Sequence, residues 1–257
     1  MSRVVDETAP ALRGDGEAPV SRVARNRQRR TEQFLRAGLR IVTEEGFDAL
    51  TMGRLSDELD TAVGSVYRYF PSKGHLVTAI QAGAVERLTE SHDRSVDPVV
   101  AAVVDRSGEP PELVRLVVTG RWFCAAAEVL PEEVRLLQMV NVRRSSALAE
   151  GGGEVILPSA LALLGRIADT VEQAQVAGLI VSGEPLARSV AWAAALGGVL
   201  ATADLAHYLP GVADGWELAR RHNVDLCVGW GADREAVTRI DRATDEVARS
   251  IPLARFD

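Results

Sequence analysis

A stretch from Thr51 to Lys73, TMGRLSDELDTAVGSVYRYFPSK, constrains the fold of this 257-residue chain most strongly. Leucines four residues apart predict a short helix, Asp60-Thr61 breaks it, and apolar residues three and four apart predict a second short helix. Pro71-Ser72 ends that helix and begins another. Helices of about two turns are not stable alone in water. The stretch therefore predicts a small domain in which longer helices pack on both sides of a short helical pair.

The second short helix carries side chains suited to phosphate contact. Tyr67, Arg68 and Tyr69 are adjacent, and Lys73 follows. Tyrosine hydroxyls, arginine and lysine are common donors to phosphate oxygens. The turn before them, 62–65, holds small residues, so this helix is able to enter a major groove about 12 Å wide. The pattern indicates the recognition helix of a helix-turn-helix; the alternative is a surface pair of helices with two exposed tyrosines.

The stretch resembles the DNA-binding domain of TetR-family transcriptional regulators. The positions that carry the resemblance, with the family's spacing, are Thr51, Leu55, Tyr67, Tyr69, Phe70, Lys73 and Leu76. The family's usual Ala-Gly-Val-Ser turn is replaced here by Leu59-Asp60-Thr61-Ala62. Asp60 tolerates the left-handed conformation that glycine usually supplies. Because the usual serine N-cap is missing at Ala62, we expect Thr61 or Asp60 to cap the second helix.

The resemblance implies an all-α protein with an N-terminal three-helix helix-turn-helix DNA-binding domain, followed by a larger helical ligand-binding and dimerisation domain. We expect a disordered arm over residues 1–21, which mix Pro, Gly, Asp and Glu, the DNA-binding domain over 22–74 and the larger domain over 75–257. Phosphate contacts are assigned to Arg25, Thr51, Tyr67, Tyr69 and Lys73. Contacts to base edges are assigned to Val63, Gly64, Ser65 and Arg68.

Charge is distributed unevenly along the chain. Residues 22–73 hold ten Lys or Arg against seven Asp or Glu, although the whole chain has a net charge of −7. Basic residues are densest from Arg22 to Arg30, and Lys73 is the only lysine. A basic helix start opposes the helix dipole, a cost that bound phosphates would remove. The asymmetry favours a local polyanion contact; a solvated basic helix end is the alternative.

Helical periodicity continues through the rest of the chain, without the sustained alternation that strands require. The first helix is expected over about 22–45. The fourth is expected from Ser72 to about Arg94, with a connection between Val96 and Pro111. Further helices are expected from Glu112, from Pro131, from Pro158, over 185–208 and over 214–228, with a last amphipathic segment over about 232–250.

The helix expected over 185–208 crowds small residues along one side. They are Ala187, Ala191, Ala194, Gly198 and Ala201. Small residues allow close helix approach, either within one subunit or across a dimer interface. In the resembling family the last two main helices form a four-helix bundle across a two-fold axis, which here implies 185–208 and 214–228. A symmetric homodimer also matches a pseudo-palindromic operator.

The resemblance further implies a pocket for a small, mostly apolar effector in the larger domain. Large side chains on separate predicted helices are the candidate lining: Trp122, Phe123, Met139, Trp192, His207 and Tyr208. Such pockets combine apolar walls with a few polar groups, which Arg121, Gln138, Asn141 and Asp204 would supply alongside His207. Ordinary core packing is the alternative for each of these side chains.

The predicted function is a dimeric, sequence-specific transcriptional repressor released from operator DNA by a small-molecule effector. The alternatives are a helical protein-interaction module without DNA binding, and an enzyme. The four histidines form no HExxH arrangement and no Cys-x-x-Cys accompanies them, so we expect no metal, no cofactor and no catalysis. Two cysteines fit a reducing cytoplasm, and no apolar run is long enough for a membrane span.

Overall fold

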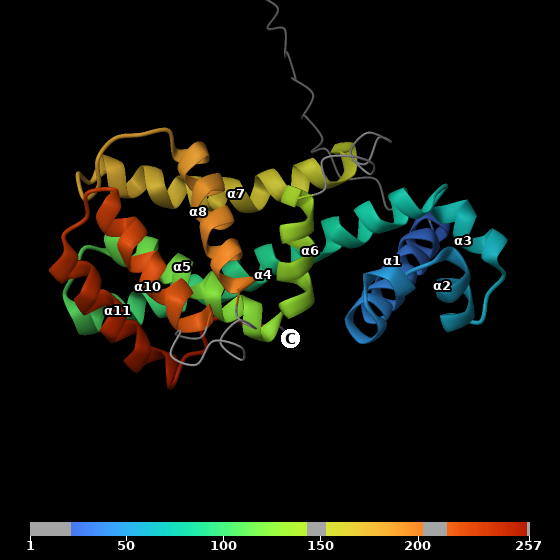
Figure 1. Ribbon diagram of the computed structural model, residues 1–257, viewed down its shortest axis with the longest axis horizontal. Helices are drawn as coiled ribbons and strands as arrows, with labels where there is room; N and C mark the ends of the chain where they lie inside the picture. Colours follow the sequence, from blue (N-terminus) through green and yellow to red (C-terminus); the bar gives the residue numbers. More distant parts are fainter. Residues whose placement is uncertain (1–21, 143–152, 203–214, 256–257) are drawn as a thin grey trace, which may run out of the picture.

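The computed structural model describes residues 22–142, 153–202 and 215–255, and every regular element within these ranges is helical. The helices are α1 (Arg22–Glu45), the 3₁₀ helix η1 (Phe47–Ala49), α2 (Met52–Glu58), α3 (Val63–Tyr69), α4 (Lys73–Ser107), α5 (Pro111–Val129), α6 (Pro131–Val142), α7 (Gly153–Val176), α8 (Pro185–Leu200), α10 (Gly215–Gly229) and α11 (Arg234–Ala248). Figure 1 shows α1, α2 and α3 at one end of an elongated molecule. The expected all-α fold, a three-helix domain followed by a larger helical domain, is confirmed.

The amino-terminal domain forms around one apolar face of α1. Phe34 and Ile41 recur at helical spacing, are fully buried, and pack with Leu55 of α2 and Val66 of α3. The hydroxyl of Thr51 caps α2 by accepting a hydrogen bond from the Arg54 amide at 3.0 Å. Packing against α1 and α4 therefore holds two short helices that would not persist alone.

Helix α4 is longer than expected. Ser72 caps its start, as predicted, but the helix runs on to Ser107 with Pro98 inside it. The expected end near Arg94 and connection from Val96 to Pro111 were therefore wrong. The side chains of Val96, Val99, Val100 and Val103 are all buried in the core of the larger domain, and this packing outweighs the hydrogen bond that proline removes. The turn is confined to Gly108–Pro110, where Gly108 has a φ of 70°.

The larger domain packs around α5, which is buried on several sides by α4, α7, α10 and α11. Trp122 of α5 is fully buried in this core. Helix α7 begins at Gly153 and contains Pro158, so the expected start at Pro158 was wrong. Pro185 opens α8 as expected, with Glu184 as its N-cap. Figure 1 shows α7 along one side, α8 running from α7 towards the middle of the molecule, and α10 and α11 at the end farthest from α3.

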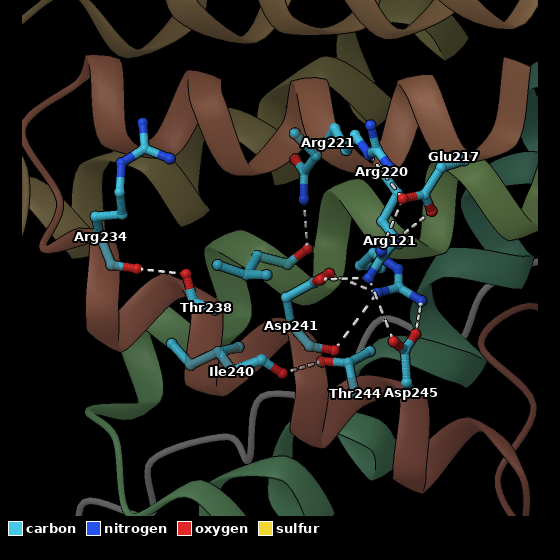
Figure 2. A network of polar contacts seen from close by, with 12 residues as sticks. Arg121, Glu217, Arg220, Arg221, Arg234, Thr238, Ile240, Asp241, Thr244 and Asp245 are labelled. Carbon is cyan, nitrogen blue, oxygen red and sulfur yellow. Dashed lines mark hydrogen bonds and ion pairs between the residues drawn. The ribbon is translucent and has the colours of Figure 1, made fainter. Parts of the chain in front are cut away.

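The last helix, α11, is an integral part of this core. Ile240 and Val237 are fully buried, and a polar network beside them joins α11 to α5 and α10 (Figure 2). Arg121 of α5 donates to Asp241 at 2.5 Å and to Asp245 at 2.5 Å. Arg220 of α10 donates to the same Asp241 at 2.7 Å. Each buried charge has opposite-charge partners, as burial requires.

Some predictions fall outside the described residues. These are the disordered arm over 1–21, the continuation of the helix from 203 to 208, and the pocket residues His207 and Tyr208 with Asp204. Met139 lies in the helical backbone of α6.

Candidate nucleic-acid interface and effector chamber

The turn between α2 and α3 adopts the conformation that the sequence indicated. Asp60 has a φ of 45° and is the only non-glycine with a positive φ in the described part of the chain. The cap differs from the expectation, because Ala62 is the N-cap of α3 and no side chain among the described residues caps the helix. The carbonyl of Ala62 instead accepts from the amide of Ser65 at 2.8 Å. Without a side-chain cap, amides of the first turn of α3 stay available to an external acceptor.

The nine predicted DNA-contact residues all lie at the surface of the amino-terminal domain, fully or partly exposed. The Tyr67 side chain is 49% exposed and Val63 is 44% exposed. A Cβ placed at Gly64 would meet no described atom within 4 Å, and its φ is not positive. Nothing within the described chain therefore requires glycine there, whereas close approach to an external surface would.

Tyr69 has a structural role besides its predicted contact. Its ring packs against Phe34 at a centroid distance of 5.2 Å. The guanidinium of Arg27 lies 5.9 Å from the ring centroid and that of Arg68 lies 5.6 Å from it. These cation–π contacts gather two positive charges from α1 and α3 around one ring. Arg27 belongs to the basic cluster from Arg22 to Arg30 but was not among the residues assigned to DNA contact.

Ion pairs brace α2 against α1. Arg54 of α2 donates to Glu45 at 2.5 Å and to Glu58 at 2.8 Å, and Arg40 of α1 also pairs with Glu58. Arg54 lowers the pKa of Glu58, and the two carboxylates raise the pKa of Arg54. These pairs set two guanidinium groups against two carboxylates. The guanidinium groups of Arg27 and Arg68, which lie beside Tyr69, take no part in them.

The larger domain contains a small apolar chamber between α5, α7 and α8. It has a volume of about 10 Å³ and is lined by Thr119, Gly120, Trp122, Phe123, Ile167, Trp192, Ala193 and Leu196. Three of the six predicted pocket residues, Trp122, Phe123 and Trp192, are therefore brought together. The sequence analysis missed Thr119 and Gly120, because a small residue on a buried helix carries no distinctive spacing signal.

Asn223 of α10 locks one wall of the chamber. It is fully buried; its Oδ1 accepts from Trp192 Nε1 at 3.0 Å, and its Nδ2 donates to the Val117 carbonyl at 3.0 Å. A Cβ at Gly120 would lie 1.9 Å from that Oδ1. Only glycine at position 120 leaves room for the Asn223 side chain, which links α5, α8 and α10.

Helix α6 connects the chamber region to the amino-terminal domain. Leu136 is 1% exposed and belongs to the core of the amino-terminal domain, together with Phe34 and Leu50. Two residues on, Gln138 donates to the Gly197 carbonyl of α8 at 3.1 Å. Glu133 of α6 pairs with Arg87 of α4 at 2.8 Å. Helix α6 thus contacts α4, α8 and the core of the amino-terminal domain at once.

The small-residue stripe of α8 lies on the surface. Ala187, Ala191, Ala194, Gly198 and Ala201 are all exposed, and larger apolar side chains flank them. Leu186 is 40% exposed and Val190 48% exposed, and the neighbouring α7 exposes Leu157 and Leu161. On α10, by contrast, Arg221 and Asp225 point outward. Among the described residues, exposed large apolar side chains therefore gather on α7 and α8. The pairing of 185–208 with 214–228 across a dimer interface stays a prediction.

Both cysteines of the chain lie in the buried core of the larger domain. Cys124 and Cys227 are free thiols whose pKa burial raises to about 12, so they behave as small apolar core groups. No cluster of potential ligands in the described ranges is able to hold a metal ion. Likewise, none of the described helices combines the length and apolar character that crossing a bilayer needs.

The amino-terminal domain is similar in sequence to known regulatory proteins. Residues 34–80 match the model for "Bacterial regulatory proteins, tetR family". The HTH-type transcriptional repressor KstR of Mycobacterium tuberculosis (strain ATCC 25618 / H37Rv) is 36% identical over 131 residues, which cover 48% of this chain and 60% of that protein. The chain thus matches less than two thirds of that relative's length.

Solved structures extend the similarity beyond the amino-terminal domain. A protein of unknown function from Rhodococcus sp. RHA1 aligns with a TM-score of 0.58 at 18% identity, covering 78% of this chain and 94% of that one. A TetR transcription regulator from Haloarcula marismortui ATCC 43049 aligns with a TM-score of 0.53 at 17% identity, covering 79% and 98%. At such identities the agreement concerns the fold.

Proposed function

Because residues 34–80 match the model for the tetR family of bacterial regulatory proteins, we propose that the protein is a cytoplasmic, homodimeric transcriptional repressor of that family. It binds a pseudo-palindromic operator through α3 and is released by a small, mostly apolar effector. One observation carries the DNA-binding part. All nine residues assigned to DNA contact lie at the surface of the family-matched end of the molecule, and none is buried.

The recognition helix docks by its amino-terminal turn. Val63, Gly64 and Ser65 face the base edges, since the absence of bulky side chains there lets the helix enter the major groove. Arg68, one turn further on, reaches a base edge as well. Its guanidinium is within 3.4 Å of the Ser65 hydroxyl, so both groups act at the same part of the groove.

Phosphate contacts flank this turn and set the register of the helix on the duplex. Thr51 at the start of α2 and Lys73 at the start of α4 bracket the recognition helix, and both are exposed. Tyr67 donates its hydroxyl from the exposed side of α3. Arg25 on α1 and the arginines near Tyr69 add positive charge beside the backbone. Neutralised phosphates release counterions, so affinity falls as salt rises.

The dimer forms through the exposed face of α7 and α8. A patch that contains Leu157, Leu161, Leu186 and Val190 is costly to leave in water, at about 25 cal/mol for each Å² of apolar surface. The alanines and Gly198 between them let two α8 helices approach closely. A Cβ at Gly198 would meet no described atom of its own chain within 4 Å, so its small size serves an external contact. Two-fold pairing places two α3 helices one groove repeat apart, about 34–36 Å.

Effector release follows from the size of the chamber. A volume of about 10 Å³ holds about one water molecule, whereas pockets for organic ligands reach about 300–1,000 Å³. An effector that enters must therefore move α8 or α7 outward. Gln138 and Leu136 transmit that movement through α6 to the amino-terminal domain, and the half-site spacing no longer matches the groove. Because the effector binds the displaced conformation, it lowers the fraction of protein in the conformation that binds DNA.

A gel shift tests the DNA-binding proposal. The probe is the DNA that flanks the protein's own coding region, titrated with wild type, Lys73→Ala and Tyr67→Phe. We expect a shift at low salt, weaker binding by both variants, and a salt slope reduced by about one for Lys73→Ala. Arg242→Ala is the matched control, because Arg242 is exposed on α11 at the opposite end of the molecule. No shift at low salt would instead favour a protein-interaction module.

A further inference from the structure

An open cleft lies beside the apolar chamber, between α4, α5 and α7. It has a volume of about 330 Å³. Six of the residues that line it are titratable: His92, Asp93, Asp97, Arg115, Arg166 and Asp169. Arg166 of α7 clamps Asp93 of α4 in a bidentate pair, at 2.6 and 2.7 Å. Arg115 of α5 donates to Asp97 of α4 at 2.6 Å. The cleft already has the volume of a small-molecule site.

One polar atom at this cleft lacks a partner. His92 is 93% buried, and its Nε2 has no hydrogen-bond partner among the described residues. Its Nδ1 lies 3.3 Å from Asp93 Oδ1. Since Arg166 keeps Asp93 ionised by lowering its pKa, Nδ1 must carry the proton that it donates. Burial lowers the pKa of His92, which favours the neutral ring. With the proton on Nδ1, the buried Nε2 is an acceptor for which the described chain offers no donor.

The cleft and the chamber adjoin at Trp122. The His92 ring packs edge-to-face on Trp122, with 5.0 Å between centroids and 89° between planes, and Trp122 lines the chamber. Thr119 also lines the chamber, and its hydroxyl is a second buried polar atom for which the described chain offers no partner. Unpaired buried polar atoms are costly. Two of them around one buried indole therefore mark a place where a ligand supplies what the chain does not.

We propose that the cleft and the chamber are the two ends of one effector site, selective for amphipathic molecules that carry a hydroxyl or N–H donor beside an apolar body. The donor binds His92 Nε2, and the apolar body enters between Trp122 and Trp192. This inference rests on the proposed effector-binding function and names the ligand class. Since His92 belongs to α4, the donor is held by the same helix that begins at the DNA-binding domain.

The test uses matched pairs of probes that differ only in the donor. Phenol is compared with anisole, and 2-naphthol with 2-methoxynaphthalene, so that each alcohol and its methyl ether share an apolar body. Binding to the full-length protein is followed by tryptophan fluorescence, because Trp122 and Trp192 line the chamber, and by calorimetry. We expect the wild type to bind each alcohol roughly tenfold more tightly than its ether, which corresponds to one buried hydrogen bond.

Two substitutions at one position separate the acceptor from packing. In His92→Asn the side chain is too short to replace Nε2, so the preference for alcohols is lost. In His92→Gln the longer amide places an oxygen near the former Nε2, so much of the preference returns. Thr119→Val, which keeps the shape of the side chain, is expected to weaken alcohol binding severalfold. Circular dichroism of each variant verifies that it folds.

Three results overturn the inference: equal binding of alcohols and ethers by the wild type, an unchanged preference in His92→Asn, or no binding of any probe. A gel shift on the same preparations reports separately on the proposed function. DNA binding without discrimination between the probes removes this ligand class and leaves the repressor proposal standing. If the protein prefers alcohols to ethers but binds no DNA, the ligand class stands and the repressor proposal falls.

Discussion

Replacing Gly120 with alanine tests the account of the chamber wall. In an ordinary helix interior this change stabilises by roughly 0.5–1 kcal/mol. Here the new methyl would lie 1.9 Å from Asn223 Oδ1 and 2.4 Å from its Cγ, an overlap that the structure must relieve. Asn223 is fully buried, so it has to leave its two hydrogen bonds.

The magnitude follows from those bonds. The Trp192 indole N–H loses its acceptor, and an unsatisfied buried donor costs about 1–3 kcal/mol. Losing the bond to the Val117 carbonyl adds about 1 kcal/mol. After subtracting the helix-propensity gain, we expect Gly120→Ala to lower the free energy of unfolding by about 2–3 kcal/mol. For a chain of this size the melting temperature would fall by roughly 5–10 °C.

Urea denaturation and thermal melting measure the effect, with Gly165→Ala as the control. Gly165 lies within α7, and a Cβ there would meet no described atom within 4 Å, so this variant should be as stable as the wild type or more so. Asn223→Ala combined with Gly120→Ala should cost less than the sum of the single changes, because the clash partner is gone. A Gly120→Ala protein as stable as Gly165→Ala would refute the reasoning.

Three further predictions follow from the same contacts. Leu136→Ala should destabilise the protein by about 2–4 kcal/mol in urea denaturation, since the side chain is 1% exposed in the amino-terminal core; a cost below 1 kcal/mol would contradict that burial. Arg220, with Arg221, lowers the pKa of Glu217 to about 2 from its ordinary 4.5, so the stability from this carboxylate is present above pH 4.5 and lost as pH falls towards 2; Glu217→Gln should flatten that decline between pH 6 and 3, and an unchanged profile would count against it. Ala194→Glu on the exposed face of α8 should shift sedimentation from dimer to monomer, whereas Ala101→Glu on the exposed side of α4 should not; a dimeric Ala194→Glu would exclude this face.

The sequence predicted the amino-terminal domain well because its constraints are local. The break between the two short helices, the helix start at Ser72 and the left-handed Asp60 each depend on residues within a few positions. The capping of α3 by Thr61 or Asp60 was the exception. There the backbone continues from the turn into Ala62 without a side-chain cap.

The larger domain was harder to predict because its constraints are long-range. Pro98 and Pro158 indicated helix boundaries, yet both lie inside helices whose apolar faces are covered by distant segments. Asn223 is joined to Trp192, 31 positions away in the chain, and to Val117, 106 positions away. The cleft at His92 depends likewise on Arg166 from another helix. The spacing of apolar residues within one helix does not predict contacts between helices that are distant in the sequence.

The central claim is that the end of the molecule carrying α3 binds duplex DNA. Lys73 is the only lysine in the chain and is exposed at the start of α4. Reductive methylation of amines therefore modifies one side chain, and the amino-terminal amine serves as an internal reference. The account predicts that saturating DNA from the flanking region slows methylation of Lys73 severalfold and leaves the reference unchanged. An unaltered Lys73 rate on fully bound DNA would contradict it.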